Sequence, residues 1–543
     1  MKKLNIIAIG ILMAMGFSAC SEDSFEEIYP DPSKSTSATC ASLLTGIFYN
    51  HNNGGNFQAS VNEYTYNSYW RLYTWENAFG RFTQTIGYEN ETGSVYYLSD
   101  SYANNRWSYF YRMLSNYRQL ENIYNNESAD AQAQDRIFKD CAEVFLYDHL
   151  SQCVDVWGDM PFTKAGYLGV TGSQEDARVP FDDDVEIYRT MLSRLGELYT
   201  DILSMKSSIN TLTASQLSAH DYINKGDLDK WAAYANSLRL RLAVHVSAQG
   251  SLSSEGQAAV KECLSRTLIS NDENAIEVYP DGDTFNLWEN FRDGYKDINN
   301  VASQPMIDAM SRVAGQPDYR MNVMYIANKD GNFIGASNAE TAAFQKLHGS
   351  AFNGFAGGAL SFAERYYSHL DSVTYTGNRN FISPIISAAE VDFLRAEAIQ
   401  SGWGSGDAKS AFINGMVNST KFYYRQNKVS ESVQGYVGEY PGDAAVKAYA
   451  EAVWDSYTNK LEAIMTMKWV HFGIIQPTQA FTDIRRTGYP ALNYPSDVSA
   501  QVCKDRPNRI KWPNSEKANN AENFAAAESA QPNEYSTKLF WAK

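Results

Sequence analysis

Five aromatic residues lie in polar, loop-like stretches of the sequence, where their side chains could contact a ligand. Tyr88, Tyr96 and Tyr97 flank a polar stretch that contains a glycine. Trp288 and Tyr295 lie among Asn, Glu and Asp residues. Tyr and Trp combine an apolar ring face with a polar edge, and a sugar ring is divided in the same way into C–H faces and hydroxyl edges. We therefore expect these five residues to be stacking platforms for a carbohydrate.

Most other aromatic residues have a simpler explanation. Aromatics make up 13% of the chain and are densest between residues 64 and 111. Within that stretch, Trp107, Tyr111 and Leu114 have the spacing of one buried helix face. The aromatic content is therefore no sign of sugar binding in itself.

No motif in the sequence indicates a catalytic site. The seven histidines form no HExxH motif, no cysteine pair has CxxC spacing, and no phosphate-binding or nucleophile-elbow motif occurs. His149 and His245 lie in helix-like segments and are interpreted as structural. The acidic cluster at residues 182–184 precedes an amphipathic stretch and is interpreted as a helix N-terminus. We expect a protein that is not an enzyme, with a helical glycosidase that uses paired carboxylates as an alternative.

Oxygen ligands for a hard cation occur at one place in the sequence. Asp281-Gly282-Asp283 could contribute two carboxylates to calcium, but an EF-hand requires further ligands at fixed steps. We expect no cofactor and no metal, and calcium at this place stays an open alternative.

The composition indicates a folded protein that does not bind nucleic acid. Apolar residues make up 44% of the 543 residues and charged residues 20%, which is enough apolar surface for a core. The formal net charge of −17 repels phosphate backbones. The five cysteines after residue 20 are widely spaced, so we expect buried thiols and no disulfide framework: Cys40, Cys141, Cys153, Cys263 and Cys503.

Helical periodicity dominates the sequence, and clear strand patterns are scarce. In residues 231–246 the apolar side chains recur at steps of three or four, while Arg239 and Arg241 fall off that stripe. Residues 387–401 begin with a capping box and end before a glycine. Helices are also predicted at residues 136–156, 185–203, 408–424, 444–472 and 477–486. Long irregular regions are predicted at residues 159–184, 271–301, 330–376 and 493–543.

The N-terminus has the features of an exported lipoprotein. A basic start, an apolar run at residues 4–17 and the sequence Ser18-Ala19-Cys20 are typical of a signal peptide with a lipobox. We expect a signal peptide at residues 1–19, lipidation of Cys20, a flexible tether at residues 20–38 and a single domain at residues 39–543. An ordinary secretory signal is the alternative.

Five segments together resemble the SusD/RagB-type nutrient-binding lipoproteins of the Bacteroidetes outer membrane. They occur in the order known from that family: DVWGDMPFT at 155–163, WAAYANSLRLR at 231–241, SAAEVDFLRAEA at 387–398, DIRRTGYP at 483–490, and PNRIKWP at 507–513 with Glu516. The resemblance implies a mostly α fold, with a tetratricopeptide-like helical repeat body that supports long loops and a ligand-binding face.

The resemblance also implies a location and a partner. Members are lipid-anchored at the outer membrane and face the cell exterior, where they pass captured glycan to a SusC-like TonB-dependent barrel. The five segments belong to the framework, so they do not transfer ligand specificity. Two alternatives within the family are a peptide-binding, RagB-like member and a structural lid of the barrel without its own ligand.

Overall fold

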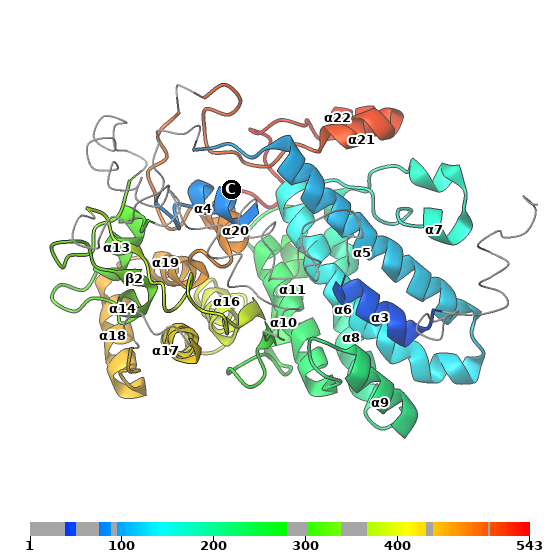
Figure 1. Cartoon of the computed structure of the whole chain (residues 1–543), viewed down its shortest axis with the longest axis horizontal. Coiled ribbons are helices and arrows are strands. Elements are labelled where there is room, and N and C mark those ends of the chain that lie inside the picture. Colours follow the sequence, from blue (N-terminus) through cyan, green and yellow to red (C-terminus); the bar gives the residue numbers. More distant parts are fainter. Residues whose placement is uncertain are drawn as a thin grey trace, which may run out of the picture.

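Helices that pack one after another build the protein (Figure 1). The structure, a computed structural model, describes residues 38–49, 75–87, 95–279, 301–337, 366–430, 438–497 and 500–543. The prediction of a mostly α fold is confirmed. Of the helices in these ranges, none is both long enough and apolar enough to span a bilayer.

The first group of helices forms one side of the body. Helix α5 packs on α6, α6 on α8, α8 on α10 and α10 on α11, while α9 lies against α3 and α6, and α3 also lies against α5 and α6. The members are α3 (Cys40–Tyr49), α5 (Asp100–Asn126), α6 (Ala129–Trp157), α8 (Asp184–Met205), α9 (Thr211–His220), α10 (Leu228–Ser247) and α11 (Ser253–Leu264). A continuous apolar core runs through this group and includes Trp512 and Trp541 from the C-terminal segment.

The second group has its own core and adjoins the first through α10 and α6, which contact α16 and α20. Its helices are α13 (Gln304–Met310), α14 (Met321–Met324), α16 (Ala388–Gln400), α17 (Ala408–Val429), α18 (Asp443–Ser456), α19 (Lys460–Phe472) and α20 (Pro477–Thr487). Helix α4 (Asn77–Phe82) packs on α20, and its apolar side chains belong to the first core. Figure 1 shows this group on the left and the first group on the right.

Short elements complete the described part of the chain. The strands form two antiparallel pairs: β1 (Ile276–Val278) with β4 (Ser383–Ile386), and β2 (Tyr325–Ile326) with β3 (His369–Leu370). The short helices are α7 (Leu168–Thr171), η2 (Gln174–Ala177), α21 (Asn514–Asn519) and α22 (Ala521–Ala530). These four helices lie within regions predicted to be irregular, as do β1 and β3, so that prediction is wrong for these residues.

Helix ends follow local capping chemistry. The Ser387 hydroxyl accepts the Glu390 N–H at 3.1 Å and begins α16, as the capping box predicted. The Asp183 carboxylate accepts the N–H groups of Val185 and Glu186 at the start of α8, which confirms the interpretation of the acidic cluster. The prediction of a single helix over residues 444–472 is wrong, because Asn459 caps a new helix, α19, within that stretch.

Helix α10 is buried on nearly all sides, including the two arginines that fall off its apolar stripe. Arg241 is 1% exposed and donates to both carboxylate oxygens of Glu390, at 2.6 and 2.9 Å. It also pairs with Asp148 of α6 at 3.0 Å. A buried arginine needs such partners, because an unpaired buried charge is strongly destabilising. The arginine therefore joins α6, α10 and α16.

Three of the five family-like segments meet where the end of α6, α20 and the C-terminal segment come together. Arg485 donates to the backbone oxygens of Asp155, at 2.5 Å, and of Asn508, at 2.8 Å. The indole N–H of Trp157 donates to the Lys511 oxygen at 3.1 Å, and that of Trp512 to the Asp159 oxygen at 2.8 Å. These residues act as framework, and they hold segments together that are far apart in the sequence.

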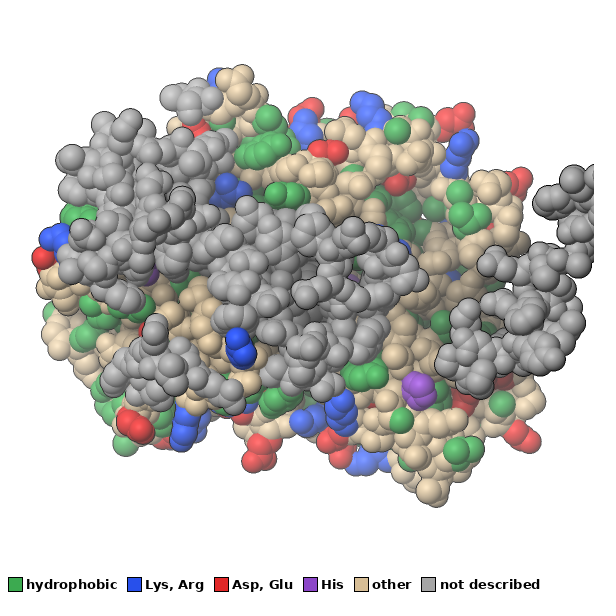
Figure 2. Space-filling view, viewed as in Figure 1, with side chains coloured by type: hydrophobic (Ala, Val, Ile, Leu, Met, Phe, Trp, Pro, Cys, Tyr) green, Lys and Arg blue, Asp and Glu red, His purple; other side chains and the backbone are tan. Residues whose placement is uncertain are grey.

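The state of the thiols and the distribution of surface charge agree with the expectations from the sequence. All five cysteines after residue 20 are buried and free, as expected. On the face in Figure 2, basic and acidic side chains lie beside one another along the lower edge, and the described part of this face shows no extended basic surface. This mixed pattern gives a polyanion no continuous surface to bind on that face.

Candidate ligand-binding surface

The expected platform residues divide between described and undescribed parts of the chain. Tyr88, Trp288 and Tyr295 lie outside the described residues, as do Cys20 and the Asp281-Gly282-Asp283 stretch. Tyr96 and Tyr97 are described, in the segment that leads into α5.

Tyr96 belongs to the core, so the expectation of an exposed ring needs correction here. Its side chain is 2% exposed, and its hydroxyl donates to the Pro495 oxygen at 2.9 Å. Burial raises the pKa of this hydroxyl well above its usual value. The physical reason is a covering segment from far along the chain: the Val95 N–H also donates to Asp497, at 3.2 Å. The Tyr96 ring therefore has no open face in this structure.

Tyr97, the next residue, is 41% exposed. Its backbone oxygen accepts a hydrogen bond from Arg81 at 3.2 Å, which fixes the backbone at this point. Tyr535 lies nearby: burial raises the pKa of its hydroxyl to about 12, and Cys503, Tyr97 and Asp100 add to the shift. The Tyr97 ring thus lies at the surface with a second tyrosine and a carboxylate near it.

A second exposed tyrosine, Tyr279, was missed by the sequence reasoning. It follows β1 directly and is 56% exposed. Its hydroxyl donates to the Glu277 carboxylate at 3.2 Å. Glu277 is buried and also accepts a hydrogen bond from Arg425. The ring is therefore held by its polar edge while its faces stay accessible.

The neighbours of Tyr279 provide polar groups for hydrogen bonding. Arg425 lies 3.6 Å from the Asp272 carboxylate, and both side chains are partly exposed. Burial, followed by the Glu277 charge, raises the pKa of the Tyr279 hydroxyl, so the phenol stays neutral at physiological pH. A neutral ring beside an arginine and a carboxylate suits a hydroxylated ligand.

These two tyrosines stand out among the exposed side chains. In the described ranges, the large apolar side chains with high exposure are Tyr97, Leu168, Leu212, Tyr279 and Val502. Both aromatic members adjoin the stretches in which the sequence places Tyr88, Trp288 and Tyr295. The signal for Tyr279 was available, since it is an aromatic residue within the irregular region predicted at residues 271–301. By contrast, Trp107 is 4% exposed and packs on Trp157, as the helical spacing predicted.

Two clusters that resemble catalytic arrangements are buried structural networks. Ser387 and His471 lie 2.7 Å apart, but both are almost fully buried, and the serine caps α16. Burial lowers the pKa of His471 to about 3, helped by Arg320 and Lys468. His245, 3.2 Å from Asp155, is also buried. A nucleophile or base must reach its substrate, and these groups have no opening to solvent.

One group in the described residues has the donor types of a metal site. Ligand atoms of Cys40, Glu127 and Asp135 lie within 4.8 Å of one another. Burial, with the neighbouring Glu127 and Asp135, raises the pKa of the Cys40 thiol well above its usual value. A protonated thiol is a poor metal ligand, and here it donates to Glu127 at 3.6 Å. A hydrogen bond explains this group better than metal binding.

Comparison with known proteins decides the family. Residues 32–513 match a family model named SusD-like and described as starch-binding and associating with the outer membrane. The chain belongs to this SusD-like family. The family is therefore described by binding and by a location, with no reaction in its description.

Solved structures share the fold of this SusD-like chain across nearly its whole length. A chitin-binding protein superposes with a TM-score of 0.71 at 19% identity, and the match covers 93% of this chain and 100% of the other. A chitin-binding SusD homolog from Flavobacterium johnsoniae gives 0.65 at 19% identity, with coverages of 92% and 97%.

A SusD-like protein from Bacteroides thetaiotaomicron gives a TM-score of 0.63 at 20% identity, with coverages of 93% and 98%. At these identities the likeness establishes the SusD-like fold and leaves the ligand open. A search of curated proteins gives no match.

Proposed function

We propose that this SusD-like protein is a non-catalytic glycan-binding lipoprotein of the outer membrane. It captures an oligosaccharide or polysaccharide at the cell exterior and delivers it to a partner TonB-dependent barrel. The carrying observation is the pair of exposed tyrosines, Tyr97 and Tyr279, in a chain whose family is described as starch-binding. The chitin-binding names of two structural relatives support the same ligand class.

The proposed mechanism is stacking combined with hydrogen bonding. Sugar rings lie on Tyr97 and Tyr279, while Arg425 and Asp272 bond to hydroxyl groups beside Tyr279. Tyr88, Trp288 and Tyr295 extend these platforms in the proposal. Each stacking contact contributes about 0.5–1.5 kcal/mol, so several weak contacts hold a polymer that can still be released to the barrel.

Ring-specific variants test the site. We expect Tyr97→Ala and Tyr279→Ala each to weaken binding about three- to tenfold, in line with the loss of one aromatic contact. The matched variants Tyr97→Phe and Tyr279→Phe keep the ring and should bind within about twofold of the wild type. Leu212→Ala, at another exposed apolar side chain, is the control for general surface changes. Affinity would be measured by calorimetry with starch and chitin oligosaccharides and by pull-down on the insoluble polymers.

Other outcomes would identify a different function. Unchanged affinity in both alanine variants would remove these tyrosines from the site. Binding of peptide mixtures without any sugar binding would indicate a RagB-like peptide carrier. No binding by the isolated protein, together with failed import on deletion, would indicate a structural lid. Release of product from the glycan would contradict the non-catalytic role.

A further inference from the structure

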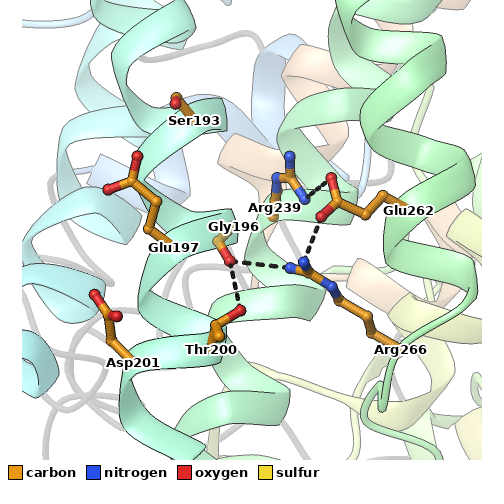
Figure 3. A pocket seen from close by; sticks show the side chains of 8 residues that line it. All are labelled: Ser193, Gly196, Glu197, Thr200, Asp201, Arg239, Glu262 and Arg266. Atoms are coloured by element: carbon orange, nitrogen blue, oxygen red, sulfur yellow. Dashed lines mark hydrogen bonds and ion pairs between the residues drawn. The ribbon is translucent and has the colours of Figure 1, made fainter. Parts of the chain in front are cut away.

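A polar groove of about 410 Å³ lies on the helical body, between α8 and the end of α11. We call it the α8–α11 groove. One wall is a single face of α8, from Ser193 to Asp201, and the other is formed by Glu262 and Arg266 (Figure 3). Helix α10 contributes Arg239, which is 8% exposed. The volume is within the usual range for small-molecule sites.

Gly196 lets an arginine lie close against α8. A Cβ at this position would be 2.7 Å from Arg239 Cζ and 2.9 Å from its Nη1. The guanidinium is fixed there by bonds from Nε to the Leu192 oxygen and from Nη1 to Glu262, both at 2.7 Å. Glycine inside a helix is less favourable than alanine by about 1 kcal/mol. Gly196 therefore makes α8 less stable at the position where the Arg239 side chain packs against it.

A second arginine converges on the same glutamate. Arg266 donates from Nη1 to the Gly196 oxygen at 3.0 Å and forms an ion pair with Glu262. Its guanidinium also lies over the Tyr199 ring, 4.9 Å from the centroid. Two guanidinium groups carry ten N–H donors, and the described contacts to Leu192, Glu262 and Gly196 use four of them. N–H donors thus remain for a ligand in the groove.

The α8 wall presents hydroxyl groups to the groove, while its two carboxylates point away from the arginines. Ser193 and Thr200 are exposed. In Figure 3 the carboxylates of Glu197 and Asp201 point away from Arg239 and Arg266. Both pair with Arg194, at 3.0 and 3.2 Å. The space between the two walls is therefore lined by N–H donors, hydroxyl groups and the carboxylate of Glu262.

This lining matches one chemical class better than the others. None of the side chains that line the groove is that of a hydrophobic residue. The lining carries two arginines and three carboxylates, those of Glu197, Asp201 and Glu262, so neither an anion nor a cation meets only opposite charge there. A neutral ligand with many hydroxyl groups can accept from the arginines and donate to Glu262 at the same time.

We propose that the α8–α11 groove binds a short neutral polyhydroxylated molecule, with the size of one or two sugar residues, independently of the aromatic surface. The site is formed by the helices themselves, whereas Tyr97 and Tyr279 adjoin loops. It would give the protein a second, weaker contact for a free saccharide or for the end of a chain.

Filling the groove tests the proposal. The probes are glucose, N-acetylglucosamine, maltose and diacetylchitobiose, followed by saturation-transfer NMR on the full chain. We expect Ser193→Trp to reduce the transferred signal of at least one probe at least fivefold. Ser204→Trp, on α8 one turn beyond the groove, should leave it within twofold of the wild type. Thr200→Trp provides a second filling variant, and circular dichroism verifies the fold of each protein.

A double variant separates this site from the aromatic surface. With Tyr97→Ala and Tyr279→Ala combined, the groove signal should persist even where polymer binding is lost. The proposal is overturned if no probe gives a signal, if both filling variants leave it unchanged, or if the tyrosine double variant alone abolishes it. Stronger binding of glucuronate than of glucose would overturn the neutral class.

Discussion

At the scale of single residues, exposure and orientation decide which aromatic rings could serve a ligand. Tyr96 and Tyr97 are neighbours in the sequence, yet one is 2% and the other 41% exposed. The sequence could nominate both, because both flank a polar stretch. It could not separate them, because the hydroxyl of the buried Tyr96 donates to the backbone oxygen of Pro495, 399 residues away. Tyr279 shows the converse, since an exposed ring is fixed by a buried carboxylate.

A buried acid gives a stability prediction at the same scale. Asp184 is 4% exposed, its N–H donates to Asp159 at 2.9 Å, and its carboxyl accepts from Gln531 at 3.2 Å. Burial, followed by the charges of Asp159 and Asp183 and partly offset by Gln531 and Arg509, raises its pKa to about 7. The folded protein therefore holds a proton that the unfolded chain loses near pH 4, so this group lowers stability as the pH rises from about 4 to 7.

We expect Asp184→Asn to be more stable than the wild type at pH 7.5, by on the order of 2 kcal/mol. The difference should shrink as the pH falls to 4 and below, where the carboxyl becomes protonated in the unfolded chain as well. Urea unfolding at several pH values would measure it. Asp183→Asn, which removes the charge at the exposed cap one residue earlier and keeps the capping chemistry, should show a smaller effect. A constant difference at all pH values would contradict the shifted pKa.

At the scale of elements, the sequence predicted the start of a helix correctly where a capping residue comes directly before an apolar helical repeat. Ser387 and Asp183 lie immediately before apolar repeats and were identified from the sequence. Asn459 was missed because the helical pattern continues across it, and residues 444–472 read as one helix. The break between α18 and α19 is marked by hydrogen bonds of Asn459, while the helical periodicity continues across it. The Asn459 side chain accepts from the Leu461 N–H at 3.0 Å and donates to the Tyr489 hydroxyl at 2.7 Å.

The Asn459 cap can be tested directly. We expect Asn459→Ala to lower the free energy of unfolding by about 1 kcal/mol, because a side-chain cap of α19 is lost. Asn459→Asp keeps an acceptor at the helix start and should recover most of that loss. Chemical denaturation monitored by circular dichroism would compare the three proteins. Equal stability of the alanine and aspartate variants would show that the cap contributes nothing.

At the scale of the whole molecule, the negative net charge and the proposed neutral ligand lead to a salt prediction. The chain carries a formal charge of −17. Binding of a neutral glycan neutralises no phosphate and releases no counterions, so its affinity should change less than about twofold between 50 and 500 mM NaCl. Calorimetry with the same oligosaccharides in both buffers would measure this. A steep loss with salt would indicate a charged ligand instead.

The fold class and the family framework were predictable at this scale, because helical periodicity and the five ordered segments extend over most of the chain. The ligand surface was not. Its described tyrosines depend on contacts such as Tyr279 with Glu277 and Arg425, which join α17 to β1 across 148 residues. The α8–α11 groove likewise depends on Gly196 and Arg239, which have no shared signal in the sequence.

The junction around Trp157 has a consequence for synthesis of the protein. The Trp157 indole bonds to a residue 354 positions later, and at about 5–20 residues per second a ribosome needs roughly 20–70 seconds to reach it. During that interval the end of α6 has its earlier neighbours Trp75 and Trp107 but lacks the C-terminal segment that completes the burial of Trp157, which is 0% exposed in the finished protein. A chain released before residue 511 would leave the Trp157 indole without this hydrogen-bond acceptor, so truncated chains should be less protected against proteases at the end of α6.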